Sequence, residues 1–170
     1  MPGYIGNGKD VAIITLHKKI KMDDKRFPAS TFKFGRNRPA AGTECSVAGF
    51  GRVSHDESTD VLRWAKFYVM ETSTCKQLIP SLTKDQICVV NDNHPLLGGD
   101  SGAPLVCGDK NREVFGIHHG GYRTEGQPET FIDFNDPKVV AFFIEEGLDN
   151  EDDCDEMVDS VEENEGSTMK

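Results

Sequence analysis

The chain has 170 residues, 28% of them charged, and a formal net charge of -10 at pH 7. The charge is local, because residues 145–170 carry 12 acidic residues and one lysine, whereas residues 1–144 carry 18 basic and 17 acidic ones. No basic patch is interleaved with aromatic residues, which argues against nucleic-acid binding, and no apolar run approaches the length of a membrane span. The sequence suggests neither a cofactor nor a metal site.

Apolar or alternating stretches, separated by Gly, Pro, Asn and Asp, predict a β-rich domain. One helix is predicted after the last strand, because Asp136 can cap its start, Pro137 suits its first turn and Gly147 ends it. The apolar face of this helix is expected to contain Val139, Val140, Phe143 and Ile144. The predicted strands span residues 10–16, 44–53, 61–70, 86–90, 103–107, 113–119 and 130–135.

The most specific motif is Gly-Asp-Ser-Gly-Ala-Pro at residues 99–104. Its glycines allow a tight turn, in which the N–H groups of Gly99 and Ser101 can converge and stabilise an oxyanion, with Ser101 as the nucleophile. The segment resembles the Gly-Asp-Ser-Gly-Gly-Pro signature of the chymotrypsin/trypsin family of serine proteases. The resemblance covers roughly residues 4–148. It implies an all-β, trypsin-like antiparallel β-barrel with a C-terminal helix, and hydrolysis of a peptide bond in a protein or peptide substrate.

A serine nucleophile needs a base and a third group that orients the base. Asp10 opens the segment Asp-Val-Ala-Ile-Ile-Thr-Leu, which is similar to the family segment that carries the orienting aspartate. The family's Ala-His-Cys segment, which carries the base, does not occur in the nine residues before Asp10. The resemblance therefore implies a partial domain over residues 1–148, with the second barrel complete and the first mostly missing. Because triad loss leaves only about 10³ to 10⁴-fold acceleration over water, we expect this chain alone to be inactive.

Two adjacent histidines, His118 and His119, end the predicted strand at residues 113–119. Where the family reads Ser-Trp-Gly, this chain reads His-Gly-Gly from His119. The family's serine lies close to the catalytic aspartate, so we expect His119 to approach Asp10. Two interpretations stay open: His119 replaces the missing base, or a neutral His119 bonds to Asp10 without chemistry. Adjacent strand residues point to opposite faces, which argues against a metal site formed by the two histidines.

The residues expected around the substrate pocket depart from the family pattern. Trypsins carry an aspartate at the pocket base, where this chain has Pro95. Glu129 replaces a wall glycine, and would either block the pocket or supply a displaced carboxylate for a basic substrate residue. Asp100 is expected to be hydrated or otherwise bonded, because a buried unpaired carboxylate is costly. The predicted pocket residues are Pro95, His119, Gly120, Gly121 and Glu129.

Five cysteines leave the disulfide connectivity open on spacing alone. The resemblance implies the pairs Cys45–Cys107 and Cys75–Cys88, with Cys154 left over. Two disulfides indicate an oxidising compartment, and hence a secreted parent protein, although the amino terminus lacks the layout of a signal peptide. Residues 149–170 are expected to form an acidic, disordered tail that could bind a basic partner.

Three hypotheses follow from the sequence. The first is an incomplete serine endopeptidase. The second is a non-catalytic protease homologue that binds proteins through its barrel surface. The third is a regulatory protein that acts through its acidic tail.

Overall fold

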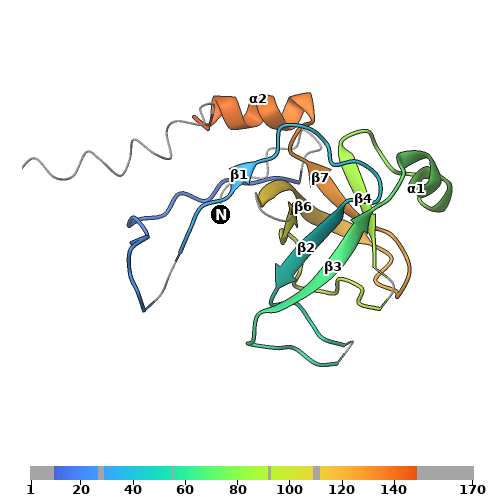
Figure 1. The fold of residues 1–170 in the computed structure, drawn as a ribbon, viewed down its shortest axis with the longest axis horizontal. Helices are drawn as coiled ribbons and strands as arrows, with labels where there is room; N and C mark the ends of the chain where they lie inside the picture. Colours follow the sequence, from blue (N-terminus) through green and yellow to red (C-terminus); the bar gives the residue numbers. More distant parts are fainter. Residues whose placement is uncertain (1–9, 27–28, 55, 92, 109–111, 149–170) are drawn as a thin grey trace, which may run out of the picture.

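The computed structural model describes residues 10–26, 29–54, 56–91, 93–108 and 112–148. Most of its regular structure is strand, with two short helices at the periphery of the molecule (Figure 1). The elements in chain order are β1 (Lys33–Phe34), β2 (Glu44–Gly49), β3 (Arg63–Val69), α1 (Thr72–Leu78), β4 (Gln86–Val90), β5 (Pro104–Cys107), β6 (Glu113–Gly121), β7 (Glu129–Asp133) and α2 (Pro137–Glu145).

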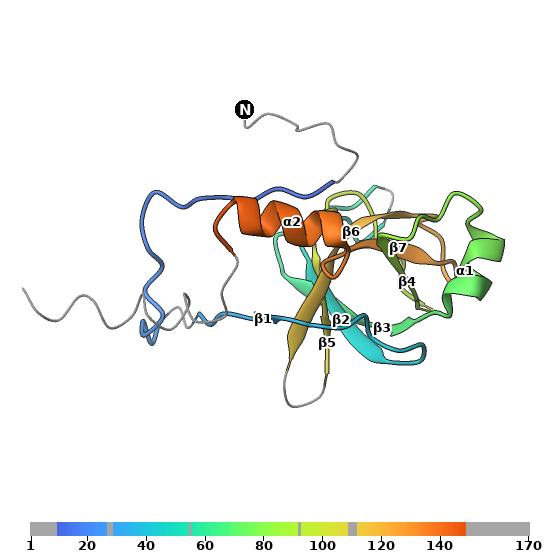
Figure 2. The same cartoon turned by 90° about the horizontal axis from the view of Figure 1, so that it is seen from above.

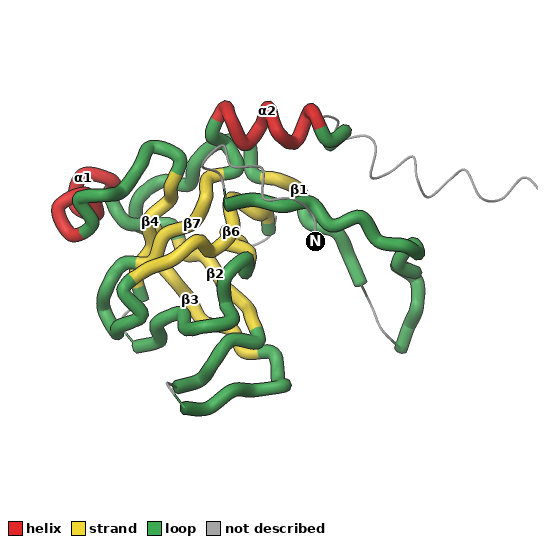
Figure 3. The backbone as a smooth tube through the Cα atoms, turned by 180° about the vertical axis from the view of Figure 1, so that it is seen from behind, coloured by secondary structure: helices red, strands yellow, loops and turns green. Residues whose placement is uncertain are grey.

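Six of the strands close into an antiparallel barrel. Their order is β6-β5-β2-β3-β4-β7, and β7 pairs again with β6, so the sheet returns to its first strand. The short β1 adds to β6 in parallel and lies outside this ring. Seen from behind, the strands are packed together while α2 crosses one side and α1 lies at another (Figure 3). The all-β barrel with a C-terminal helix is therefore confirmed.

The strand predicted at residues 10–16 is wrong. Val11 and Ile13 pack against a small core between β7 and α2, but Ile14 is 82% exposed and Leu16 is 55% exposed. The segment alternates as a strand does, yet among the described residues it has no strand to pair with, so it remains extended without a sheet. In Figure 2 this segment runs alongside α2.

The helix predicted after the last strand is confirmed as α2. The side chain of Asp136 accepts a hydrogen bond from the N–H of Lys138, as an N-cap should. Its predicted apolar face is only half right. Val139 and Phe143 are buried, whereas Val140 is 39% exposed and Ile144 is 53% exposed. The helix packs through a narrow stripe of residues four apart.

Both disulfides implied by the family resemblance are present. Cys45 and Cys107 lie directly opposite each other on the neighbouring strands β2 and β5, and their bond links these strands within the barrel core. Cys75 and Cys88 join α1 to β4, where they form a small core with Leu82. Cys154 lies outside the described residues, as does the whole segment 149–170. In the described part of the chain, neither helix is long and apolar enough to cross a membrane.

Candidate active site

The predicted nucleophile lies on a tight turn that leads into β5. Gly99 and Gly102 adopt φ values of 104° and 85°, which favour glycine because a Cβ is strained there. The N–H of Ala103 donates to the carbonyl of Asp100 at 2.9 Å and closes the turn. Ser101 is exposed at its apex. The two glycines that flank Ser101 in the sequence motif are thus required by the local backbone.

Asp100 points back from this turn into the protein. Its Oδ1 accepts from the N–H of Gly51 and its Oδ2 accepts from the N–H of Leu97, each at 3.0 Å. A Cβ at Gly49 or Gly51 would collide with this carboxylate. The expectation that Asp100 is hydrated or otherwise bonded is confirmed, because two backbone amides donate to its carboxylate.

The N–H groups of Gly99 and Ser101 make no hydrogen bond to any residue in the described part of the chain. Both residues are exposed at the turn. Two unbonded N–H groups, two residues apart on a turn fixed by glycines and by Asp100, are donors of the kind that bind an anionic oxygen.

Asp10 and His119 lie together at the end of β6. The Nδ1 atom of His119 is 3.1 Å from Oδ2 of Asp10, and the side chains are 39% and 54% exposed. The pairing of β6 with β7 shifts between His118 and Gly120, which leaves His119 as the extra residue of a β-bulge. His119 is exposed, and the N-terminal segment, which packs through Val11 and Ile13, brings Asp10 to it.

His118, beside it, points into the protein. Its Nε2 atom is 3.1 Å from Oε2 of Glu129, and the two side chains are only 4% and 1% exposed. The other carboxylate oxygen accepts from the N–H of Leu96 at 3.3 Å. The sequence reasoning did not assign a role to His118. Strand alternation could have indicated that His118 points into the protein, because it requires His118 and His119 to face opposite sides.

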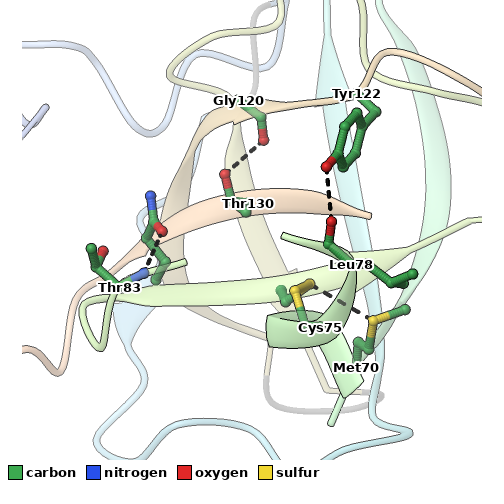
Figure 4. Close-up of a disulfide and its surroundings, with 9 residues drawn as sticks. Met70, Cys75, Leu78, Thr83, Gly120, Tyr122 and Thr130 are labelled. Carbon is green, nitrogen blue, oxygen red and sulfur yellow. Dashed lines mark hydrogen bonds between the residues drawn. A yellow bond between two sulfur atoms is a disulfide. The ribbon is translucent and has the colours of Figure 1, made fainter. Parts of the chain in front are cut away.

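The predicted pocket residues separate into two groups. His119, Gly120 and Gly121 border a surface hollow of about 760 Å³, which Tyr122 and Ile79 also line. Two hydrogen bonds shape its wall: Thr130 Oγ1 donates to the carbonyl of Gly120 at 2.7 Å, and Tyr122 donates to the carbonyl of Leu78 at 2.8 Å (Figure 4).

Glu129 forms the second group with the loop that contains Pro95. Glu129 is buried inside the barrel, and its bond to Leu96 reaches the residue next to half-buried Pro95. Among the described residues, no group of three or more His, Cys, Asp or Glu could hold a metal ion.

Comparison with known proteins decides the family. The trypsin family model matches residues 1–140. The chain belongs to the trypsin family. It is 31% identical to trypsin of Sus scrofa over 128 residues, which cover 71% of this chain and 53% of that protein. It is 32% identical to human cathepsin G over 126 residues, which cover 72% of this chain and 48% of that protein.

A solved structure supports the fold. The barrel matches neuropsin, a serine protease expressed in the limbic system of mouse brain, with a TM-score of 0.61 and 20% identity over 69% of this chain and 53% of that one. The chain thus spans about half the length of the relatives it matches. Membership of the trypsin family supports a peptidase-like function, and the two disulfides fit an extracellular protein.

Proposed function

We propose that this chain carries the nucleophile and the oxyanion site of a secreted serine endopeptidase. The observation that carries the proposal is the turn at residues 99–102, which exposes the Ser101 hydroxyl beside two unbonded N–H groups. Asp100 fixes the turn through backbone amides, so the donors are already oriented before a substrate binds. Preorganised donors of this kind stabilise the charge that develops when a hydroxyl attacks a carbonyl.

In the proposed reaction Ser101 Oγ attacks the carbonyl carbon of a peptide bond, and the carbonyl oxygen becomes an anion held by the N–H groups of Gly99 and Ser101. The hydroxyl proton must pass to a base, which later gives it to the leaving amine. We assign the orienting role to Asp10. His119 already bonds to that carboxylate, and we propose that it does so without acting as the base.

The proposal therefore assigns the general base to none of these 170 residues. A missing base lowers turnover by on the order of 10⁶-fold in a comparable serine protease. We expect these 170 residues by themselves to cleave no peptide at a measurable rate, although Ser101 still reacts slowly with an activated ester.

The test is acylation by p-nitrophenyl acetate followed by peptide mapping with mass spectrometry. We expect one acetyl group on Ser101, absent in Ser101→Ala, and no cleavage of a mixed peptide library. His119→Ala should acylate at the same rate as the unmodified chain. Acetylation elsewhere, with none on Ser101, would exclude Ser101 as the nucleophile. Peptide cleavage that depends on both Ser101 and His119 would show instead that His119 is the base.

A second candidate is a non-catalytic homologue that binds a protein or peptide. The buried His118–Glu129 pair favours it, because it fills space where the family resemblance places a substrate side chain. If the chain is such a homologue, its protein or peptide ligand should bind Ser101→Ala as tightly as the unmodified chain. Ser101 should then not be acylated.

A further inference from the structure

Both oxygens of the Glu129 carboxylate are in contact with groups of the chain itself. Leu96 supplies an N–H to Oε1, and the imidazole of His118 lies against Oε2. A carboxylate oxygen accepts hydrogen bonds, so Nε2 of His118 carries the hydrogen in this contact. The side chain is 1% exposed, and a carboxylate buried this deeply is costly unless it is paired.

The absence of a side chain at Gly121 leaves room for the Glu129 carboxylate. A Cβ placed on Gly121 would collide with Oε2 of Glu129, whereas a Cβ on the neighbouring Gly120 would have no heavy atom within 4 Å. The carboxylate therefore lies against β6 at Gly121, which borders the surface hollow. Among the described residues, its hydrogen-bond partners are the His118 ring and the Leu96 amide.

The His118 ring is held less firmly than its backbone. Its Nδ1 atom is buried without a hydrogen-bond partner among the described residues, and its other recorded ring contact is with Phe131, at 5.3 Å between centroids. By contrast, its N–H donates to the carbonyl of Ala103 and its carbonyl accepts from the N–H of Gly102. Removing the ring would leave both of these backbone hydrogen bonds, from β6 to the residues that follow Ser101, in place.

We propose that His118 is a specificity-determining residue, whose ring occupies the place where a cationic side chain of a peptide would meet the Glu129 carboxylate. The imidazole N–H makes the contact that a guanidinium or ammonium group would make with this carboxylate. The chain thus closes its own site for basic residues. This inference rests on the proposed function, since it takes Glu129 to lie in the wall of the substrate pocket.

The experiment removes the His118 ring and offers a small cation in solution as a new partner for Glu129. In His118→Ala, methylguanidinium, the head group of an arginine side chain, is titrated against the chain and followed by NMR and by thermal unfolding. We expect it to bind His118→Ala and to leave the unmodified chain unchanged. Binding should weaken on the order of tenfold to a hundredfold in H118A/E129Q, because a charged acceptor is lost.

Two controls isolate the charge and the space. The neutral isostere N-methylurea should bind His118→Ala far more weakly than methylguanidinium. His118→Gln keeps an N–H donor beside Glu129, and we expect it to bind methylguanidinium no better than the unmodified chain. A folded His118→Ala that does not bind the cation, or an unmodified chain that binds it equally well, would overturn the proposal.

If His118→Ala does not fold, a measurement on the unmodified chain takes its place. Diethyl pyrocarbonate modifies accessible imidazoles, and we expect His118 to be protected while exposed His94 and His119 react. Equally fast modification of His118 in the folded chain would exclude it as the group that closes the site. Neither measurement depends on Ser101. If Ser101 is not acylated but His118→Ala still binds the cation, the proposed reaction is rejected and the cation site at Glu129 is retained.

Discussion

His118 and His119 are adjacent residues of one strand, and each has a ring nitrogen 3.1 Å from a carboxylate oxygen. Their surroundings differ. The His118–Glu129 pair is 4% and 1% exposed, whereas the His119–Asp10 pair is 39% and 54% exposed. The same contact distance therefore describes two different interactions. Water can replace either partner of the exposed pair, but nothing replaces a lost partner of the buried one.

The largest effect is expected when the buried pair is broken. Glu129→Ala leaves two buried donors, the His118 ring and the Leu96 N–H, without their acceptor. At about 1–3 kcal/mol for each unsatisfied donor, it should lower the free energy of unfolding by about 2–6 kcal/mol. Urea unfolding measures this loss. The double variant H118L/E129M, which replaces both partners by apolar side chains, should recover most of it. A loss in Glu129→Ala no greater than that in Asp10→Ala would remove the distinction between the two pairs.

The two glycines after the histidines sharpen the comparison. Gly121→Ala would push a methyl group into the Glu129 carboxylate, and we expect it to cost about 1–3 kcal/mol of stability. Gly120→Ala meets open space and should change stability by no more than about 0.5 kcal/mol. Thermal unfolding of the two variants side by side gives the difference. Equal losses would show that Glu129 does not lie against Gly121 in solution.

Breaking the exposed pair should matter much less. Asp10→Ala removes the carboxylate from His119, and we expect a change in stability of about 0–1 kcal/mol. What remains of the effect should decrease as salt is added, because the pair is open to solvent. Urea unfolding at low and high ionic strength measures both. A large loss that is independent of salt would mean that Asp10 anchors the N-terminal segment by more than this contact.

A third carboxylate, Glu44, gives the smallest expected effect. The hydrogen bond from Lys66, whose Nζ lies 2.8 Å from Oε1, lowers the pKa of Glu44 below its ordinary value of 4.5. A lowered folded-state pKa stabilises the protein above pH 4.5, and this contribution is lost as the pH falls through the lowered value. Glu44→Gln should therefore flatten the dependence of thermal stability on pH slightly in this acidic window. An unchanged pH profile would show that the Lys66 contact is not maintained in solution.

The sequence was most informative where local chemistry decides the structure. The turn around Ser101 was predictable because Gly99 and Gly102 are required for its backbone, and the strand at residues 86–90 was predicted with its observed bounds. The disulfides followed from the family resemblance and not from spacing. The proximity of His119 to Asp10 was also expected from the resemblance, whereas the catalytic roles of Asp10, Ser101 and Gly99 stay predictions.

The sequence-based predictions were wrong where tertiary contacts determine the structure. The alternation of residues 10–16 predicts a strand, but a strand needs a neighbour, and pattern alone does not show whether one is present. Val140 and Ile144 are apolar at helical spacing, yet the barrel covers only a narrow stripe of α2. The sequence predicted Glu129 as a pocket residue, but it did not predict that His118 is its partner. That pairing depends on the register of β6 against β7.

The bulge at His119 has a consequence for how this strand can change. As the extra residue in β6, it has no residue opposite it on β7, so its side chain is free of the pairing that constrains its neighbours. Evolution or a protein engineer can vary this position while the barrel stays in register. A spin label or fluorophore that replaces the His119 ring would lie beside Asp10 and report on the N-terminal segment, with little disturbance of the sheet.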